Sequence, residues 1–330
     1  MTDASRVSVG EKVRDAAMPG SMAFESTTLE TIEVFAPAGY DADPARLDHA
    51  RHYFEERGHR FITAFDPNGR HTRFAAPDDE RLEQLRDVVG APTTDIAIAL
   101  RGGYGITRLL PRIDFEAMAK AIVDGGKRFV GHSDFTAIEL GLLAKTGAIS
   151  FAGPMASYDF GGASVDAFTE MHFWRAMREA RVDVSFETPH DDLCASGVLW
   201  GGNLAMVASL VGTPWMPLVE GGVLFIEDIN EQPYRVERML LQLFHAGIFE
   251  RQRLVLCGDF SGYRLAPYDN GYDVEAAIDH VRSMTSVPIV TGLPFGHCPK
   301  KLTLAVGAPI DVSVSGGLCR LQQRWNLTGR

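Results

Sequence analysis

Short apolar runs alternate with longer amphipathic stretches along the first half of the chain. The apolar runs have the length of buried strands, and the stretches between them repeat their apolar residues at helical spacing. The pattern predicts strands at 31–35, 59–65, 95–100 and 129–130 and helices at 44–57, 78–88, 114–123 and 136–143. Strands that alternate with helices indicate an α/β fold, with a parallel sheet covered by helices on both faces.

The pattern loosens after about residue 155 and then resumes. The second half predicts helices at 166–180, 204–211 and 233–246, a loop at 189–192, and strands at 197–200, 222–227, 254–257 and 287–290. Two alternating stretches, 302–306 and 310–314, flank Gly307-Ala-Pro309 and predict a closing hairpin. We therefore expect four segments along the chain: a flexible extension at 1–29, an N-terminal domain at 30–160, a linker at 161–195 and a C-terminal domain at 196–330.

Composition narrows the class of protein. The chain has 330 residues and a formal net charge of −11, which disfavours a nucleic-acid groove. No apolar run reaches the length of about 18 residues that a membrane span needs. The first 29 residues are charged and lack the apolar core of a secretory signal, and the four cysteines are widely spaced, as in a reduced cytosolic protein. We expect a cytoplasmic protein without nucleic-acid or membrane partners.

Ser133 lies where the strand at 129–130 turns into the helix at 136–143. A sharp turn from strand to helix leaves its side chain at the sheet edge, beside the unpaired N–H groups of the new helix. A nucleophilic serine would be useful there. The simpler interpretation is a helix cap, because serine is a favoured N-cap and the Gly-x-Ser-x-Gly elbow lacks its second glycine here.

The run Arg101-Gly-Gly-Tyr-Gly105 follows another buried strand and so falls at the same sheet edge. Neither a Gly-Lys-Ser/Thr sequence nor Gly-x-Gly-x-x-Gly spacing is present, so a phosphate loop is disfavoured. Glycines also let a backbone approach closely and present N–H donors, which would stabilise an oxyanion. A tight turn alone would explain one or two of the glycines, but hardly three preceded by an arginine.

Two more polar residues follow predicted strands. Glu227 ends the strand at 222–227, and His297 lies in the glycine-punctuated loop after 287–290. Glu227 would be either a surface cap or a buried group that orients a base, and a lone loop histidine is usually just exposed. Open α/β sheets bind ligands beyond the carboxyl ends of their strands, and a serine with a base and an orienting acid performs acyl transfer. The histidine pair His49/His52 and the run His190-Asp-Asp192 are better explained as solvated surfaces than as metal sites, so no metal is predicted.

Several long motifs resemble the LD-carboxypeptidase family, the muramoyltetrapeptide carboxypeptidases of murein recycling. They are Arg101-Gly-Gly-Tyr-Gly-Ile-Thr-Arg-Leu-Leu110, Gly131-His-Ser-Asp-Phe-Thr-Ala137, Gly201-Gly-Asn-Leu-Ala-Met206, Gly212-Thr-Pro-Trp-Met-Pro217, Glu227-Asp-Ile-Asn-Glu-Gln-Pro-Tyr-Arg-Val-Glu-Arg-Met-Leu240 and Phe295-Gly-His297. The resemblance covers roughly residues 30 to 315. It implies a serine peptidase with the triad Ser133, Glu227 and His297. It also implies a flavodoxin-like N-terminal domain, a swivelling β/α C-terminal domain and a homodimer. The extension at 1–29 and the run Cys298-Pro-Lys-Lys301 depart from the pattern.

The expected reaction is hydrolysis of the L,D-peptide bond to a terminal D-alanine in a murein tetrapeptide, without a cofactor. The backbone N–H groups of Gly103 and Asp134 are the candidates for an oxyanion hole, and five side chains are candidates for substrate contact: Arg101, Tyr104, Trp200, Asn203 and Arg235. Two alternatives stay open. One is an immunity peptidase of the microcin C type, which cuts an aminoacyl-nucleotide amide. The other is a non-catalytic sensor of muropeptides.

Overall fold

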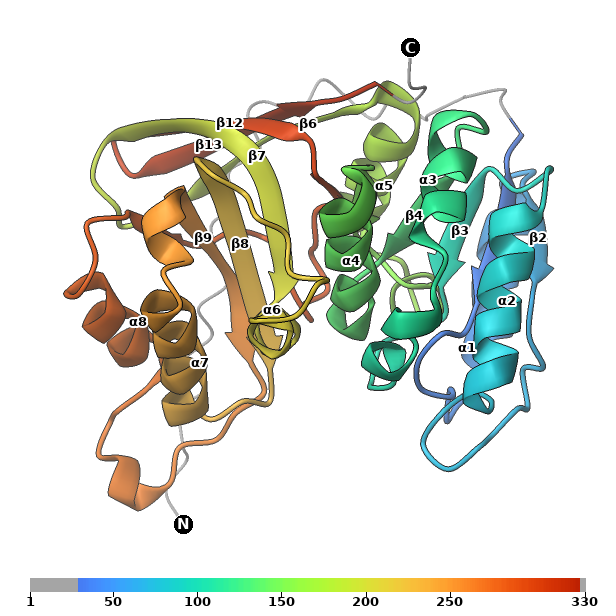
Figure 1. Ribbon diagram of the computed structural model, residues 1–330, viewed down its shortest axis with the longest axis horizontal. Helices are drawn as coiled ribbons and strands as arrows, with labels where there is room; N and C mark the ends of the chain where they lie inside the picture. The colour runs from blue at the N-terminus through green and yellow to red at the C-terminus, as the bar shows by residue number, and fades with distance from the viewer. Residues whose placement is uncertain (1–28, 327–330) are drawn as a thin grey trace.

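Two sheets form the centres of two packed units in the computed structural model, which describes residues 29–326 (Figure 1). The expected extension at 1–29 therefore lies, except for Leu29, outside the described residues. The unit with the first sheet contains most of the first half of the chain, and the unit with the second sheet most of the second half. Helices α4 and α6 meet between the two sheets (Figure 1).

The first sheet has the strand order β11-β5-β4-β3-β1-β2. Its strands are β1 (Thr31–Phe35), β2 (Arg60–Thr63), β3 (Ile96–Ala99), β4 (Arg128–Gly131), β5 (Ser150–Ala152) and β11 (Leu304–Val306). The pairs among β1 to β5 are parallel, and the order 2-1-3-4-5 is that of flavodoxin-like folds. The predicted parallel α/β architecture of the first half is confirmed.

Four helices belong to the first sheet: α1 (Ala45–Glu56), α2 (Asp78–Gly90), α3 (Phe115–Val123) and α4 (Thr136–Thr146). Helix α2 packs against α3, and α3 packs against α4. Helix α1 instead contacts α5 (Ala167–Glu179), where the Tyr53 hydroxyl donates to the carboxylate of Glu170 at 2.8 Å. Right-handed crossovers put α1 on one face of such a sheet and α2 to α4 on the other. Strands β1, β3 and β4 are nearly all buried, because both faces of the sheet are covered.

The second sheet has the order β10-β9-β8-β7-β12-β13-β6. Its strands are β6 (Arg181–Glu187), β7 (Leu193–Asn203), β8 (Gly222–Ile229), β9 (Gln252–Ser261), β10 (Ile289–Thr291), β12 (Pro309–Ser315) and β13 (Leu318–Arg324), and its helices are α6 (Leu204–Leu210), α7 (Pro233–His245) and α8 (Val274–Arg282). Strands β7 to β10 are parallel, and β12, β13 and β6 extend the sheet with antiparallel pairs.

The predicted closing hairpin is wrong. Strand β11 pairs with β5 of the first sheet, whereas β12 pairs with β7 and β13 of the second. Gly307 between them has a φ of 94°, a conformation that glycine adopts without strain, and the chain leaves one sheet for the other at this point. The segment predicted as a linker, 161–195, carries helix α5 and strand β6, and β6 pairs with β13 of the second sheet.

Candidate active site

Ser133 occupies a strained turn between β4 and α4. Its φ is 62°, in the left-handed region that a residue other than glycine adopts at a cost of roughly 1–3 kcal/mol. It opens the short 3₁₀ helix Ser133–Phe135, which continues directly into α4. A Cβ atom on Gly131 would lie 2.7 Å from the ring of Phe135, so the turn needs a glycine there. Strand, strained serine and helix together match the geometry of a nucleophile elbow.

Gly102 lies directly against Ser133. A Cβ atom at position 102 would be 2.6 Å from both the Cβ and the Oγ of the serine, closer than non-bonded carbon atoms approach. The Gly102 carbonyl accepts a hydrogen bond from the N–H of Gly39 at 3.3 Å, which fixes this backbone. The glycine run therefore allows the close backbone approach that its sequence suggested. The specific role of Gly102 was not predicted, and the only signal for it was the run itself.

The two N–H groups predicted to form an oxyanion hole lie beside this contact. No loop hydrogen bond within residues 29–326 uses the Gly103 N–H, and Asp134 is the second residue of the 3₁₀ helix, where N–H groups have no partner inside the helix. The Asp134 side chain is buried and accepts a bond from the N–H of Ile106 at 3.0 Å. Burial raises the pKa of this carboxyl to about 6. Asp134 thereby joins the serine turn to the segment that follows the glycine run.

Glu227 and His297 form a hydrogen-bonded pair. The Glu227 carboxylate is fully buried, and its Oε2 accepts a bond from Nδ1 of His297 at 2.8 Å. The ring of His297 stands edge-on to the ring of His132, with centroids 5.0 Å apart, and His132 directly precedes Ser133. Within residues 29–326 no hydrogen bond joins the Ser133 hydroxyl to His297. Such bonds are often long in a free enzyme and shorten when substrate binds.

Asn203 supports the carboxylate of Glu227, and its contact with substrate stays a prediction. It pairs with Glu227 in the parallel register of β7 and β8, and its Nδ2 donates to Glu227 Oε1 at 3.3 Å and to Asp228 Oδ1 at 3.0 Å. Its own N–H donates to Thr136 Oγ1 at 3.1 Å, three residues after the serine. A Cβ atom on Gly202 would lie 2.4 Å from that hydroxyl. Asn203 thus joins the unit of Ser133 to the acid of the other unit.

Two other predicted substrate contacts are Trp200 and Arg235. Trp200 is only 1% exposed, and its indole N–H donates to Gln252 at 2.8 Å, so it is a core residue and that prediction is wrong. The strand was correct, but its burial on both faces was not foreseen. Arg235 lies on the exposed side of α7, where it pairs with Glu231 at 3.6 Å. Among the contacts of the described residues none connects Arg235 with Ser133, and the role of Arg235 stays a prediction.

Comparison with known proteins identifies the family. The sequence profile of the LD-carboxypeptidase N-terminal domain matches residues 32–153, and that of the LD-carboxypeptidase C-terminal domain matches residues 196–312. The Bacillus subtilis (strain 168) protein named "Probable murein peptide carboxypeptidase" is 31% identical over 84% of this chain and 87% of the relative. The chain belongs to the LD-carboxypeptidase family. The resemblance seen in the motifs is confirmed, and family membership makes the chain a carboxypeptidase.

Solved structures of the family have the same fold. The crystal structure of muramoyltetrapeptide carboxypeptidase from Oxalobacter formigenes superposes with a TM-score of 0.84 and 46% identity, covering 89% of this chain and 99% of that one. The microcin C7 self-immunity protein in complex with aspartyl sulfamoyl adenosine superposes with a TM-score of 0.81 over 91% of this chain and 97% of that one, at 20% identity, which shows the fold alone. The predicted two-domain α/β architecture is confirmed.

A cationic rim lies beside the glycine run of this carboxypeptidase. We call Arg70, Arg73 and Arg101 the arginine rim. Each lies over a tyrosine ring: Arg70 over Tyr40 at 5.0 Å, Arg73 over Tyr104 at 5.4 Å and Arg101 over Tyr158 at 5.4 Å. A Cβ atom on Gly103 would lie 4.0 Å from the Arg101 guanidinium. No ion pair within residues 29–326 includes an arginine of the rim.

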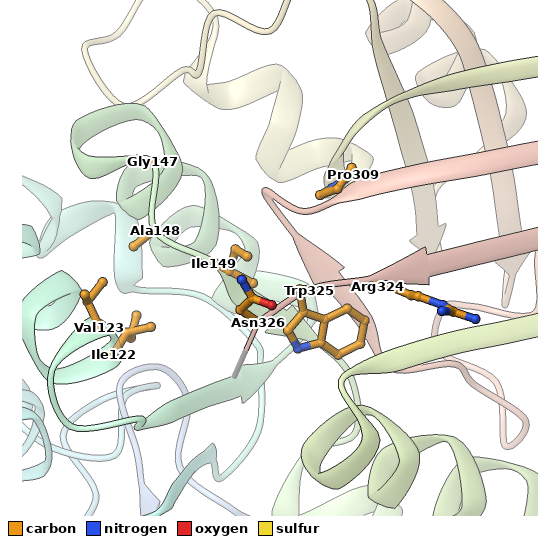
Figure 2. A pocket seen from close by; sticks show the side chains of 9 residues that line it. All are labelled: Ile122, Val123, Gly147, Ala148, Ile149, Pro309, Arg324, Trp325 and Asn326. Atoms are coloured by element: carbon orange, nitrogen blue, oxygen red, sulfur yellow. The ribbon is translucent and has the colours of Figure 1, made fainter. Parts of the chain in front are cut away.

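Figure 2 shows a surface pocket of about 470 Å³ that does not contain any of these residues. It is lined by Ile122, Val123, Gly147, Ala148, Ile149, Pro309, Arg324, Trp325 and Asn326 (Figure 2). These come from the end of α3, the segment before β5, the start of β12 and the end of β13 with the two residues after it. The end of α3 leads into β4 and residues 147–149 lead into β5, so the pocket lies at the end of the first sheet opposite Ser133. It contains no residue of the candidate active site.

Between residues 29 and 326, no group of three or more His, Cys, Asp or Glu side chains is arranged to hold a metal ion. No helix in the same range is both long and apolar enough to cross a lipid bilayer.

Proposed function

We propose that this chain is a serine-type LD-carboxypeptidase with Ser133 as nucleophile, His297 as base and Glu227 as the acid that orients it. The 2.8 Å bond from His297 Nδ1 to Glu227 carries the proposal, since it leaves Nε2 of the ring as the group that accepts a proton. The Ser133 Oγ attacks the substrate carbonyl as His297 takes its proton. His297 then protonates the leaving amine. Acid–base help of this kind contributes about 10²–10⁴-fold to the rate.

The N–H groups of Gly103 and Asp134 are proposed to bind the oxyanion of the tetrahedral intermediate. The position of these two residues supports this role. Gly103 follows Gly102, which touches Ser133, and Asp134 directly follows the serine. Donors arranged in advance around a developing negative charge are worth roughly 3 kcal/mol each. The buried side chain of Asp134 holds its own backbone in place through Ile106.

The proposed substrate is a murein tetrapeptide, cut at the L,D-bond before its terminal D-alanine. A carboxypeptidase must recognise a free carboxylate, and guanidinium groups bind carboxylates well. The unpaired arginine rim, with Tyr104, supports recognition of an anionic peptide next to Ser133. We further propose that the protein acts on peptides recycled into the cytoplasm, that it works as a homodimer and that its two domains are residues 30–160 and 196–330.

Cleavage of two epimeric tetrapeptides tests the substrate assignment. A carboxylate held in one place puts only one epimer's carbonyl near Ser133, and an error of about 1 Å can cost about 10²-fold in rate. We expect mass spectrometry to show release of D-alanine from the peptide that ends in D-alanine, and none of L-alanine from its epimer. EDTA should have no effect, because the triad needs no metal. The control variant Ser133→Ala should lose several orders of magnitude in kcat.

Cleavage of an aminoacyl-nucleotide amide is the alternative activity to be tested. The microcin C7 self-immunity protein of Escherichia coli is 25% identical over 71% of this chain and 75% of the relative. If the protein cuts an aminoacyl-nucleotide amide but neither tetrapeptide, the murein assignment is wrong and the triad stands. If it binds tetrapeptides but cuts nothing, the non-catalytic sensor is the better description.

A further inference from the structure

The loop that carries His297 connects the two units of the molecule. It begins after β10 of the second sheet and ends at β11, which belongs to the first. Glu227 fixes the His297 ring from β8, an element of the second unit. Ser133 lies in the first unit, so Glu227 alone does not determine the distance between base and nucleophile. A second restraint is needed to hold the loop against the serine turn.

Lys301, four residues beyond His297, makes such a contact. Its ammonium pairs with Asp159 of the first unit at 2.7 Å, and the two side chains are only 3% and 8% exposed. The other Asp159 oxygen accepts the N–H of Met155 at 2.7 Å. The Lys301 N–H donates to Thr169 Oγ1 at 2.9 Å, and that hydroxyl donates to the Pro299 carbonyl at 2.7 Å. The loop thus contacts the first unit through the buried ion pair of Lys301 with Asp159 and through the hydroxyl of Thr169.

Lys301 also touches the histidine next to the nucleophile. The carbonyl of Gly153 accepts a bond from Nδ1 of His132 at 2.8 Å, so this nitrogen carries the proton. The unprotonated Nε2 faces the Lys301 ammonium at 3.4 Å, and the same ring makes the T-shaped contact with His297. Burial, followed by the charges of Lys301 and His297, holds the pKa of His132 well below its usual range. The ring therefore stays neutral.

We propose that Lys301 is a positioning residue for His297, which it holds against the Ser133 turn through its buried contacts with Asp159 and His132. The inference rests on the proposed triad, since it assigns a task to the loop only if His297 is the base. The charge balance fits this task. The Lys301–Asp159 pair is neutral as a whole and His132 carries no charge, so the imidazolium that forms on His297 meets no unpaired cation. Sequence reasoning had no function for the Cys298-Pro-Lys-Lys301 run, and the structure supplies one.

The test measures Ser133 reactivity directly, without a peptide substrate. A fluorophosphonate probe forms a P–O bond with an activated serine as fluoride leaves, and mass spectrometry locates the label. The decisive variant is Lys301→Met with Asp159→Asn, which leaves no buried charge unpaired. We expect labelling and kcat for D-alanine release to fall by about 10²-fold with KM little changed, because a shift of about 1 Å in the base is enough. The single variant Lys301→Arg keeps the positive charge and should therefore label faster, and have a higher kcat, than the double variant.

Two variants complete the comparison. Lys300→Met removes an exposed lysine from the same loop, one that has no ion pair within residues 29–326, and should label like the wild type. Thr169→Val removes the hydrogen bonds of Thr169 Oγ1 with Lys301 and Pro299 without leaving a buried charge unpaired. It should slow labelling about tenfold. The proposal can therefore be judged even if the double variant fails to fold.

Circular dichroism checks that each variant is folded. The proposal is overturned if folded Thr169→Val labels Ser133 as fast as the wild type and the double variant, where it folds, does the same. Wild-type protein that labels but releases no D-alanine would contradict the substrate assignment alone. A wild-type Ser133 that does not label would overturn the triad and this inference together.

Discussion

Gly102 shows how much of the candidate active site depends on a single missing side chain. The backbone at this position passes so close to Ser133 that any Cβ atom would meet the serine Oγ. The serine backbone is strained at the same point, and Glu227, which bonds to His297, comes from the other sheet. Strain and close approach of this kind occur at catalytic sites, where geometry is held at the expense of stability.

Gly102→Ala tests this contact. The added methyl group would lie 2.6 Å from the serine Oγ and displace it, so we expect kcat/KM to fall by at least about 10²-fold. The matched control is Gly90→Ala at the end of α2, where a Cβ atom meets nothing within 4 Å. Steady-state kinetics with circular dichroism would compare the two. Full activity of folded Gly102→Ala would show that the close approach has no catalytic role.

Helix α4, which follows the turn at Ser133, contains a buried acid without a hydrogen-bond partner among the described residues. Glu139 is 0% exposed, and neither of its carboxyl oxygens has a hydrogen-bond partner within residues 29–326. Burial raises the pKa of this carboxyl well above its usual range. The folded protein therefore keeps the proton at pH values where the unfolded chain has lost it. Because the unfolded state then binds fewer protons, stability decreases as the pH rises above about 4.5.

Glu139→Gln should remove this pH dependence. We expect the variant to be more stable than the wild type at pH 7 to 8, with a gain that shrinks toward pH 4, where Glu139 is protonated in both states. Urea unfolding at several pH values measures the difference. The exposed Glu116→Gln on α3 is the control, since it should leave the pH dependence as it is. An equal slope in Glu139→Gln and wild type would contradict the assignment.

The whole molecule is joined more closely than its two family domains suggest. The first sheet is completed by β11, which comes from residues 304–306, and α5 and β6 lie between the two matched regions. The chain therefore crosses between the units more than once. We expect each crossing to help hold the proposed acid and base near the proposed nucleophile.

The first unit should consequently not be stable alone. A fragment of residues 29–165 lacks β11, which leaves the edge of β5 unpaired, and exposed edges of this kind favour aggregation. We expect size-exclusion chromatography with light scattering to show aggregates of the fragment. Adding residues 300–307 through a flexible linker should recover a larger fraction of monomer. A fragment that is monomeric and as stable as the full chain would show that the boundary at residue 160 separates an independent domain.

Hydrophobic periodicity by itself determined the parallel first sheet, its helices and the positions of Ser133, Glu227 and His297 after strand ends, because these features depend on residues close together in the sequence. Tertiary structure decided what depends on long-range partners. Strand β11 alternates like half of a hairpin, yet its partner lies about 150 residues earlier in β5. Trp200 and Asn203 follow one another closely along β7, but one is buried against Gln252 and the other bonds to Glu227. The contacts of Lys301 with Asp159 and His132 join residues that only the packing of the two units brings together.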